Sequence, residues 1–356
     1  MYLFSCSKLY LGTGQTNEFG GCEMIKVGMI GAGCMGGVHA AAYKRLTEAR
    51  LVAICDLKPE KAEKLAGEGV RVVTDYHEIL QDPDIDVVDV CLPTYLHKEV
   101  VLEAAAAGKH VFCEKPIARS IEDAEAMVKA CKDAGVKLSV GHVVRFFPDY
   151  YKVKNVLTSG QIGEPKVIRT SRGGAFPAWP EDNWYADFEK SGGPIVDLII
   201  HDFDFLRWMF GPVKRVFAKS LTGKHHMLDH ALVTLRFENG IIAHVEGSWA
   251  QPAGTPFATT LEIAGTKGLY EYSNQDAMPI MLRTAAGEAR ASAVPESPLA
   301  LEPYTAELKA FMKSIIDDTE VPVPGEEAIE ALRISLAACE SAETGEVVWL
   351  GGANRG

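Results

Sequence analysis

The fold of this chain is decided by the stretch Ile25-Lys26-Val27-Gly28-Met29-Ile30-Gly31-Ala32-Gly33-Cys34-Met35-Gly36, in which an apolar run leads directly into a glycine-rich turn. A second apolar run, residues 51–55, ends on Asp56. A strand, a glycine turn, a helix, a second strand and an acidic residue form the order that a dinucleotide-binding unit requires. We therefore expect this segment to bind a dinucleotide. The alternative is a glycine-rich turn in an ordinary α/β protein.

Each residue of the turn has an expected role. Gly31 allows the tight turn, Gly33 lets the backbone approach a pyrophosphate, and Gly36 lets the helix pack on the strand. Cys34 and Met35 lie at the start of that helix. Its free N–H groups and the positive end of its dipole would hold the phosphates.

Asp56 predicts which dinucleotide is used. Its carboxylate can accept hydrogen bonds from the adenosine ribose hydroxyls of NAD, and it would repel the 2′-phosphate of NADP. Lys58 lies two residues further on and could reach such a phosphate. The sequence therefore predicts NAD as the cofactor and leaves the use of NADP open.

The composition is that of a globular protein long enough for two domains: 356 residues, 47% hydrophobic and 24% charged. The net charge of −12 argues against a nucleic-acid partner, because a phosphate backbone would be repelled. We expect no membrane association, since no apolar run is long enough to cross a bilayer. The eight cysteines form no CxxC pair, which predicts reduced thiols in a cytoplasmic protein.

The periodicity divides the chain in two. Strand-like and helix-like runs alternate up to about residue 145, which predicts a doubly wound parallel sheet of the Rossmann type. Further on, residues 231–237 and 241–249 flank Asn239-Gly240, and residues 259–264 and 269–272 flank a second glycine turn. These hairpins predict an α+β domain with a mostly antiparallel open sheet. We expect a peripheral tail over 1–23, a dinucleotide-binding domain over 24–145 and a substrate and oligomerisation domain over 146–356.

Two further groups of residues carry chemistry. Glu114-Lys115-Pro116 follows a predicted parallel strand, at the sheet edge where such folds bind ligands. Lys115 could reach the reacting end of the dinucleotide and Glu114 its nicotinamide-side ribose. Read alone, the pair would be better explained as a surface ion pair in a turn.

The second group is Asp197 and His201, on a predicted helix that runs from Pro194 to Gly211. The i, i+4 spacing places both on one helix face. A histidine held by a carboxylate is a competent general base near neutral pH. The alternatives are a hydrogen-bonded core histidine and a zinc site, and we expect no metal because no third ligand has a recognisable spacing.

Together these residues resemble the glucose–fructose oxidoreductase, inositol dehydrogenase and rhizopine-catabolism (Gfo/Idh/MocA) family. The resemblance runs from Met24 to the C-terminus. It rests on the glycine loop, the Glu-Lys-Pro turn, the spaced Asp and His, and one further segment, Cys91-Leu92-Pro93-Thr94 with His97. One departure is Pro194, which stands where most members have a third small residue after Gly192-Gly193.

The resemblance implies a function and roles for these residues. Leu92, Pro93, Thr94 and His97 would lie along the cofactor. Lys115 and Asp197 would orient the substrate, and His201 would be its acid/base. The implied enzyme is an NAD-dependent dehydrogenase of a sugar, a cyclitol or another small polyhydroxylated substrate, assembled as a homodimer or homotetramer. A reductase of a keto-sugar or imine using NADPH, and a dinucleotide-binding regulator without turnover, remain alternatives.

Five residues of the second domain are candidates for substrate contacts, because aromatic and polar groups together suit a sugar or cyclitol ring. They are Arg145, Arg172, Trp179, Trp184 and Tyr185. Core packing or a surface salt bridge would explain each one individually.

Overall fold

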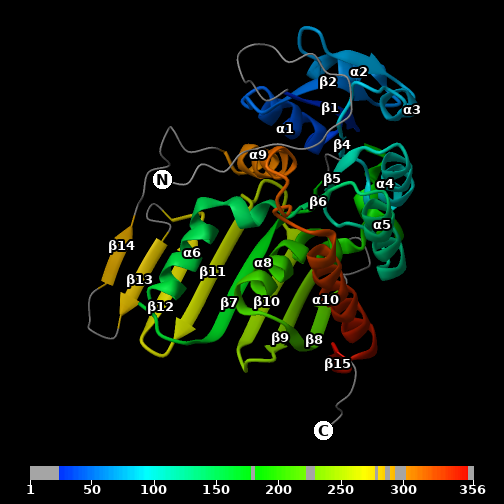
Figure 1. The fold of residues 1–356 in the computed structure, drawn as a ribbon. Helices are drawn as coiled ribbons and strands as arrows, with labels where there is room; N and C mark the ends of the chain where they lie inside the picture. Colours follow the sequence, from blue (N-terminus) through cyan, green and yellow to red (C-terminus); the bar gives the residue numbers. More distant parts are fainter. Residues whose placement is uncertain are drawn as a thin grey trace, which may run out of the picture.

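The computed structural model describes residues 24–177, 181–221, 229–276, 280–284, 289–292 and 302–351. The predicted tail over 1–23 and the candidate Trp179 lie outside these ranges. Two sheets dominate the structure, one above the other in Figure 1, with helices between and around them. Among the described helices, none combines the length and the apolar character that a membrane span requires.

The first sheet is parallel and six-stranded, as the sequence predicts. In sheet order its strands are β3 (Arg71–Val73), β2 (Ala49–Cys55), β1 (Ile25–Ile30), β4 (Val87–Val90), β5 (His110–Glu114) and β6 (Leu138–Gly141). Its helical segments are α1 (Cys34–Tyr43), α2 (Pro59–Leu65), α3 (His77–Leu80), η1 (Thr94–Leu96), α4 (His97–Ala106), α5 (Ile121–Asp133) and η2 (Val143–Phe146). The apolar runs form strands because helices cover both faces of this sheet, and all four residues of β4 are buried.

The second sheet has nine strands and is mostly antiparallel. In sheet order they are β14 (Ala289–Ser292), β13 (Ile280–Thr284), β12 (Gly268–Ser273), β11 (Ala258–Gly265), β7 (Pro165–Ala175), β10 (Ile242–Gln251), β9 (His230–Phe237), β8 (Val213–Leu221) and β15 (Val348–Trp349). Both predicted hairpins are present, as β9–β10 and β11–β12. Strand β7 lies at the centre of the sheet. It pairs in parallel with β10.

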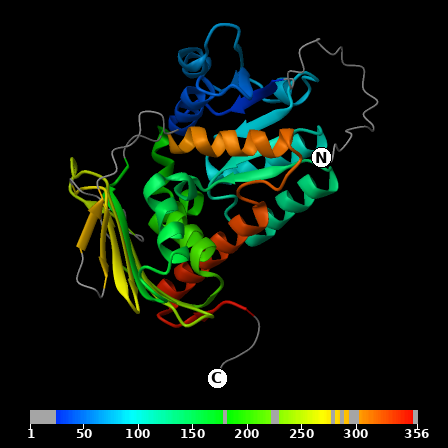
Figure 2. The same ribbon diagram turned by 60° about the vertical axis from the view of Figure 1, so that its left-hand side comes forward.

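Helices pack on one face of this second sheet (Figure 2). The helical segments after η2 are α6 (Pro148–Thr158), η3 (Glu181–Ala186), α7 (Phe188–Ser191), η4 (Pro194–Leu198), α8 (Ile200–Phe210), α9 (Pro303–Ile316) and α10 (Gly325–Thr344). The predicted helix from Pro194 is therefore two segments. The first, η4, is π-helical, with the Ile199 N–H bonded to the Pro194 carbonyl at 2.9 Å.

The two C-terminal helices join the two sheets. Leu308, Phe311 and Met312 of α9 pack with Val27 and Phe112 in the core of the first sheet. Helix α10 contributes Leu332 to the first sheet's core and Ile334 to the second. Figure 2 shows α9, in orange, running across the parallel sheet. A division at residue 145 therefore separates the two sheets but not the helices that cover them.

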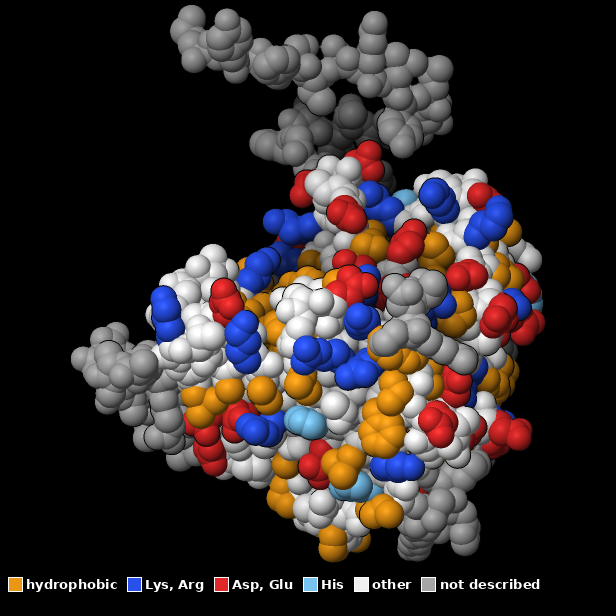
Figure 3. Space-filling model, turned by 90° about the horizontal axis from the view of Figure 1, so that it is seen from below, with side chains coloured by type: hydrophobic (Ala, Val, Ile, Leu, Met, Phe, Trp, Pro, Cys, Tyr) orange, Lys and Arg blue, Asp and Glu red, His pale blue; other side chains and the backbone are white. Residues whose placement is uncertain are grey.

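The surface is mixed in character. Figure 3 shows acidic, basic and hydrophobic side chains interspersed over the lower face. Several large hydrophobic side chains of the second sheet are exposed, among them Phe217, Leu221 and Leu232. Phe217 and Leu221 lie on β8, and Leu232 lies on the neighbouring β9.

Candidate active site

A cavity of about 1800 Å³ lies between the carboxyl ends of the parallel strands and the second sheet. This is the edge at which open α/β sheets bind ligands. The predicted site residues that line it are Gly31, Gly33, Cys34, Met35, Asp56, Leu92, Pro93, Thr94, Glu114, Lys115, Arg172, Trp184, Tyr185, Asp197 and His201. Gly36, His97 and Arg145 are not part of its lining.

The glycine loop is shaped by its own packing. Gly31 has a positive φ of 104°, and a Cβ there would lie 2.4 Å from the Cys91 carbonyl oxygen. A Cβ at Gly36 would lie 2.1 Å from the carbonyl oxygen of Gly31. The absence of a side chain at Gly36 therefore allows the close approach of the loop backbone, in addition to any effect on helix packing. A Cβ at Gly33, the N-cap of α1, would meet no atom within 4 Å. The loop thus leaves open space at the helix N-terminus, as a bound pyrophosphate requires.

Asp56 ties the loop to the end of β2. It accepts the Ala32 N–H at 2.8 Å and the Lys58 N–H at 2.9 Å. These bonds hold the carboxylate at the cavity wall, where it can also accept from a ribose. Lys58, Lys61 and Lys64 line the same end of the cavity.

The Glu-Lys-Pro turn follows β5 and contains a cis peptide bond between Lys115 and Pro116. Glu114 accepts the Lys115 N–H at 3.1 Å. Its other carboxylate oxygen lies 3.0 Å from Nε2 of the buried His39. Glu114 is therefore held from two sides at the edge of the cavity.

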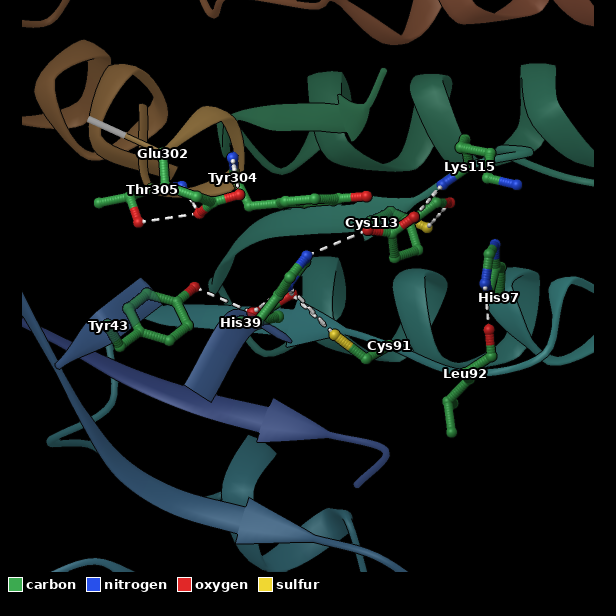
Figure 4. Close-up of polar contacts among 12 residues, drawn as sticks. His39, Tyr43, Cys91, Leu92, His97, Cys113, Lys115, Glu302, Tyr304 and Thr305 are labelled. Carbon is green, nitrogen blue, oxygen red and sulfur yellow. Dashed lines mark hydrogen bonds and ion pairs between the residues drawn. The ribbon is translucent and has the colours of Figure 1, made fainter. Parts of the chain in front are cut away.

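His39 belongs to a buried cluster behind this turn, shown in Figure 4 with Tyr43, Cys91 and Tyr304. Its Nδ1 lies 2.9 Å from Asp89 and 3.2 Å from the Cys91 sulfur. Burial alone would lower the pKa of His39, but its contacts with Asp89 and Cys91 raise it well above its ordinary value. The carboxylates of Asp89 and Glu114, one beside each ring nitrogen, favour the protonated form of His39.

His39, Asp89 and Cys91 also offer the donor set of a metal site, with ligand atoms within 4.8 Å of one another. These atoms already bond to one another through hydrogen bonds, which account for the cluster without a metal. This cluster was not predicted from the sequence. Asp89, a charged residue inside an apolar strand, was the one sequence feature that indicated a buried polar group there.

Lys115 and Asp197 form an ion pair across the cavity wall. The Lys115 ammonium donates to the Asp197 carbonyl at 2.7 Å and to its carboxylate at 3.2 Å. Tyr185 also hydrogen-bonds this carboxylate. Burial raises the pKa of Asp197, and the neighbouring Lys115 opposes that rise. Asp197 therefore holds the lysine, in place of the histidine that the sequence analysis assigned to it.

No hydrogen bond or ion pair joins His201 to Asp197 among the described residues, although both line the cavity. Asp197 lies in the π-helical segment η4 and His201 in the first turn of α8. The Nδ1 atom of His201 is buried and has no hydrogen-bond partner among the described residues. Burial lowers the pKa of His201 well below its ordinary value, and the positive charges of Lys115 and Arg172 lower it further. His201 is neutral at pH 7 and can accept a proton.

His97 connects two backbone segments behind the cavity wall. Its Nδ1 lies 3.0 Å from the Pro116 carbonyl and its Nε2 2.8 Å from the Leu92 carbonyl. It thereby ties the segment after β4 to the Glu-Lys-Pro turn from behind the cavity wall. The ring is buried outside the cavity lining, so the structure places His97 behind the residues that would contact a cofactor.

Arg145 likewise does not line the cavity. Its guanidinium is buried and binds Asp204 at 2.6 and 2.8 Å, and also Glu327 of α10. Asp204 is on α8 and Glu327 is on α10, so the arginine of η2 joins three segments. Arg172 does line the cavity, although Asp202 accepts from its Nε at 2.7 Å.

Aromatic residues form the remaining wall. Trp184 stacks on Tyr185 with centroids 4.3 Å apart, and Trp249 packs edge-on to Tyr185. Tyr304 lines the cavity from the first turn of α9. The sequence analysis missed Trp249 and Tyr304. No sequence signal could have found Tyr304, because its helix lies far along the chain from the parallel strands.

The arrangement can carry out proton and charge chemistry on a hydroxyl group. A cationic Lys115 and a neutral His201 line one cavity, beside a glycine loop at a helix N-terminus. A preorganised cation stabilises a developing alkoxide, and a neutral imidazole accepts its proton.

Comparison with known proteins gives consistent results. The family described as "Oxidoreductase family, NAD-binding Rossmann fold" (GFO_IDH_MocA) matches residues 25–142, and its C-terminal domain (GFO_IDH_MocA_C3) matches residues 150–271. Myo-inositol 2-dehydrogenase of Thermotoga maritima is 34% identical, over 90% of this chain and 96% of that protein.

Two solved structures share the fold over almost their whole length. An oxidoreductase from Agrobacterium radiobacter, in complex with NAD+, L-tartaric acid and magnesium, has a TM-score of 0.82 at 28% identity and covers 91% of this chain and 98% of its own. Levoglucosan dehydrogenase, in complex with NADH and L-sorbose, has a TM-score of 0.83 at 26% identity and covers 93% of this chain and 100% of its own.

Proposed function

Because this chain belongs to the Gfo/Idh/MocA oxidoreductase family, with its NAD-binding Rossmann fold, we propose that it is an NAD-dependent dehydrogenase of a secondary alcohol in a cyclitol or sugar. The observation that carries the proposal is that Lys115, held by Asp197, and a neutral His201 line the same cavity. The inositol and levoglucosan enzymes named above support the substrate class. The aromatic wall of Trp184, Tyr185 and Trp249 suits the apolar face of a ring.

The residues around the cavity fit the cofactor. Gly33 leaves open space at the N-terminus of α1, where free N–H groups can bind the pyrophosphate. Asp56 at the end of β2 can accept from the adenosine ribose, which favours NAD over NADP. NAD, when bound, supplies the hydride acceptor at nicotinamide C4.

The protein's own residues handle the proton and the charge. His201 takes the hydroxyl proton of the substrate, and Lys115 stabilises the alkoxide that develops. Asp197 keeps the ammonium of Lys115 in place through its carbonyl and carboxylate oxygens. In the opposite direction the same groups serve the reduction of a ketone, with His201 returning the proton.

The assembly and location belong to the proposal as well. The exposed hydrophobic side chains of β8 and β9 support a homo-oligomer formed through the second sheet, as a dimer or tetramer. The six cysteines among the described residues are free thiols, which supports a cytoplasmic location.

A substrate panel tests the proposal. Polyols and sugars are offered with NAD and with NADP, and the absorbance of the reduced cofactor is followed. We expect turnover of at least one cyclitol or sugar with NAD. Tight NADH binding without turnover across the panel would contradict the proposal and favour a dinucleotide-binding regulator.

A further inference from the structure

His201 lacks the partner that a catalytic histidine requires. A general base that works through one ring nitrogen needs a hydrogen bond at the other nitrogen, which sets the tautomer and the ring orientation. The Nδ1 atom of His201 is buried without such a partner among the described residues. Because Asp197 is engaged with Lys115, another group must serve this role.

The neighbour on the buried side is His142. It follows β6 directly and lies behind the cavity wall, fully buried. Its ring is perpendicular to that of His201, with centroids 6.3 Å apart. Neither of its ring nitrogens has a hydrogen-bond partner among the described residues. Two adjacent buried histidines thus hold three unsatisfied nitrogens, and buried polar groups are rarely left unpaired in folded proteins.

Asp204 supplies an acceptor beside His142. One of its oxygens lies 4.0 Å from His142 Nδ1, too far for a direct hydrogen bond. Arg145 binds both oxygens of this carboxylate, at 2.6 and 2.8 Å, and holds it in position. This buried cluster therefore offers a nitrogen from each ring and a carboxylate oxygen, and a buried water typically makes about three hydrogen bonds.

We propose that His142 is a positioning residue for His201, which it orients through one bridging water backed by Asp204. The inference rests on the proposed function for its catalytic meaning. The water accepts the Nδ1–H of His201 and donates to a lone pair of His142 and to Asp204. His201 is thereby held as the tautomer with a bare Nε2 directed to the cavity, and no group changes its covalent bonds.

The electrostatics are consistent with this arrangement. Burial lowers the pKa of His142, so the ring is neutral and keeps a lone pair available. The charged groups that face it act in both directions. Asp204 and Glu114 raise the pKa, while Arg145 and Lys115 lower it.

Nitrogen NMR of the full-length protein, labelled with ¹⁵N-histidine, tests the proposal in the absence of substrate. We expect the wild type to show His201 with a protonated Nδ1 and a bare Nε2. His142→Phe keeps a ring but removes both nitrogens, and should shift His201 toward the Nε2–H tautomer that free histidine favours. His142→Gln retains a polar atom for the water and should preserve the wild-type tautomer.

The outcomes separate this inference from the proposed function. The tautomer is measured whether or not any polyol is oxidised, so a failed substrate panel leaves this test intact. A wild-type His201 with a protonated Nε2 would overturn the inference without any variant, as would an unchanged tautomer in His142→Phe. If that variant does not fold, the wild-type spectrum and His142→Gln still decide.

Kinetics provide a second measurement. We expect His142→Phe to lower kcat by about tenfold at unchanged NADH affinity, a part of the roughly 10²–10⁴-fold that positioned acid–base groups contribute. The base limb of its pH profile should move, whereas His142→Gln should restore the wild-type profile. The matched control is His110→Phe, a histidine outside the cavity lining that accepts the Lys137 N–H. This variant should leave both kcat and the His201 tautomer unchanged.

Discussion

Lys115→Met removes the cation of the proposed site while keeping the length of the side chain. In the folded protein the Lys115 side chain is only 14% exposed, and its ammonium pairs with the carboxylate of Asp197, whose side chain is 8% exposed. Losing one preorganised group that stabilises developing charge typically costs about 10²–10³ in kcat, or roughly 2.7–4 kcal/mol. We therefore expect turnover to fall by that factor while NADH binding is kept.

The substitution should also cost stability, for a separate reason. Breaking a buried ion pair leaves an uncompensated charge and typically costs about 3–5 kcal/mol. Because this pair borders a cavity, we expect the lower end, about 3 kcal/mol. The double variant Lys115→Met/Asp197→Asn removes the orphaned charge, so it should recover much of the stability and none of the turnover.

The assay measures kcat at saturating NAD and polyol, NADH affinity by fluorescence, and the free energy of unfolding in urea. Lys109→Met is the matched control, because Lys109 is a buried lysine outside the cavity that donates to the carbonyls of Asp82 and Ile85 at 2.6 and 2.7 Å. It should lose stability and keep its kcat. Near wild-type kcat in Lys115→Met would refute the reasoning. Restored turnover in the double variant would assign the loss to the orphaned carboxylate.

Three further substitutions test other parts of the site. His201→Ala should abolish the base limb of the kcat/KM pH profile. In the wild type this limb lies below pH 6.5, because burial and nearby cations lower the pKa of His201. A limb that survives the substitution would point to another base. Asp56→Ser should shift the kcat/KM ratio toward NADP, and an unchanged ratio would show that the carboxylate does not face the ribose. Arg145→Met should lower the free energy of unfolding by about 3 kcal/mol with the substrate KM unchanged, since its partners are Asp204 and Glu327; a raised KM at unchanged stability would return it to the substrate contacts.

Much of the fold follows from local patterns in the sequence. The glycine loop and the alternating apolar runs predict the parallel sheet, and Asn239-Gly240 predicts the β9–β10 hairpin. The N-cap of α5 illustrates the limit of such reasoning. Ser120 accepts the Asp123 N–H at 3.1 Å, as a capping box requires, but the Asp123 carboxylate binds Lys98 at 2.6 Å instead of turning back. The motif predicts the local backbone conformation, but the partner of the Asp123 side chain depends on which residues pack beside the helix.

The partners of the site residues were decided only by the tertiary structure. Asp197 and His201 are four residues apart, yet Asp197 pairs with Lys115, which is 82 positions away. Asp197 lies in a π-helical turn at 194–198, an irregularity that helical periodicity does not reveal, and His201 lies in the α-helix that follows. Tyr304 reaches the cavity because α9 returns to the first sheet.

The sequence by itself therefore determined the dinucleotide-binding unit, the two sheets and the identity of the residue types at the site, because spacing and periodicity are local properties. The tertiary structure decided which lysine, carboxylate and histidine meet. It buried Arg145 and His97 in structural contacts and placed His142 behind His201. Such contacts depend on how elements far apart in the chain pack together. A buried charge forms an ion pair with the oppositely charged group that this packing brings close to it.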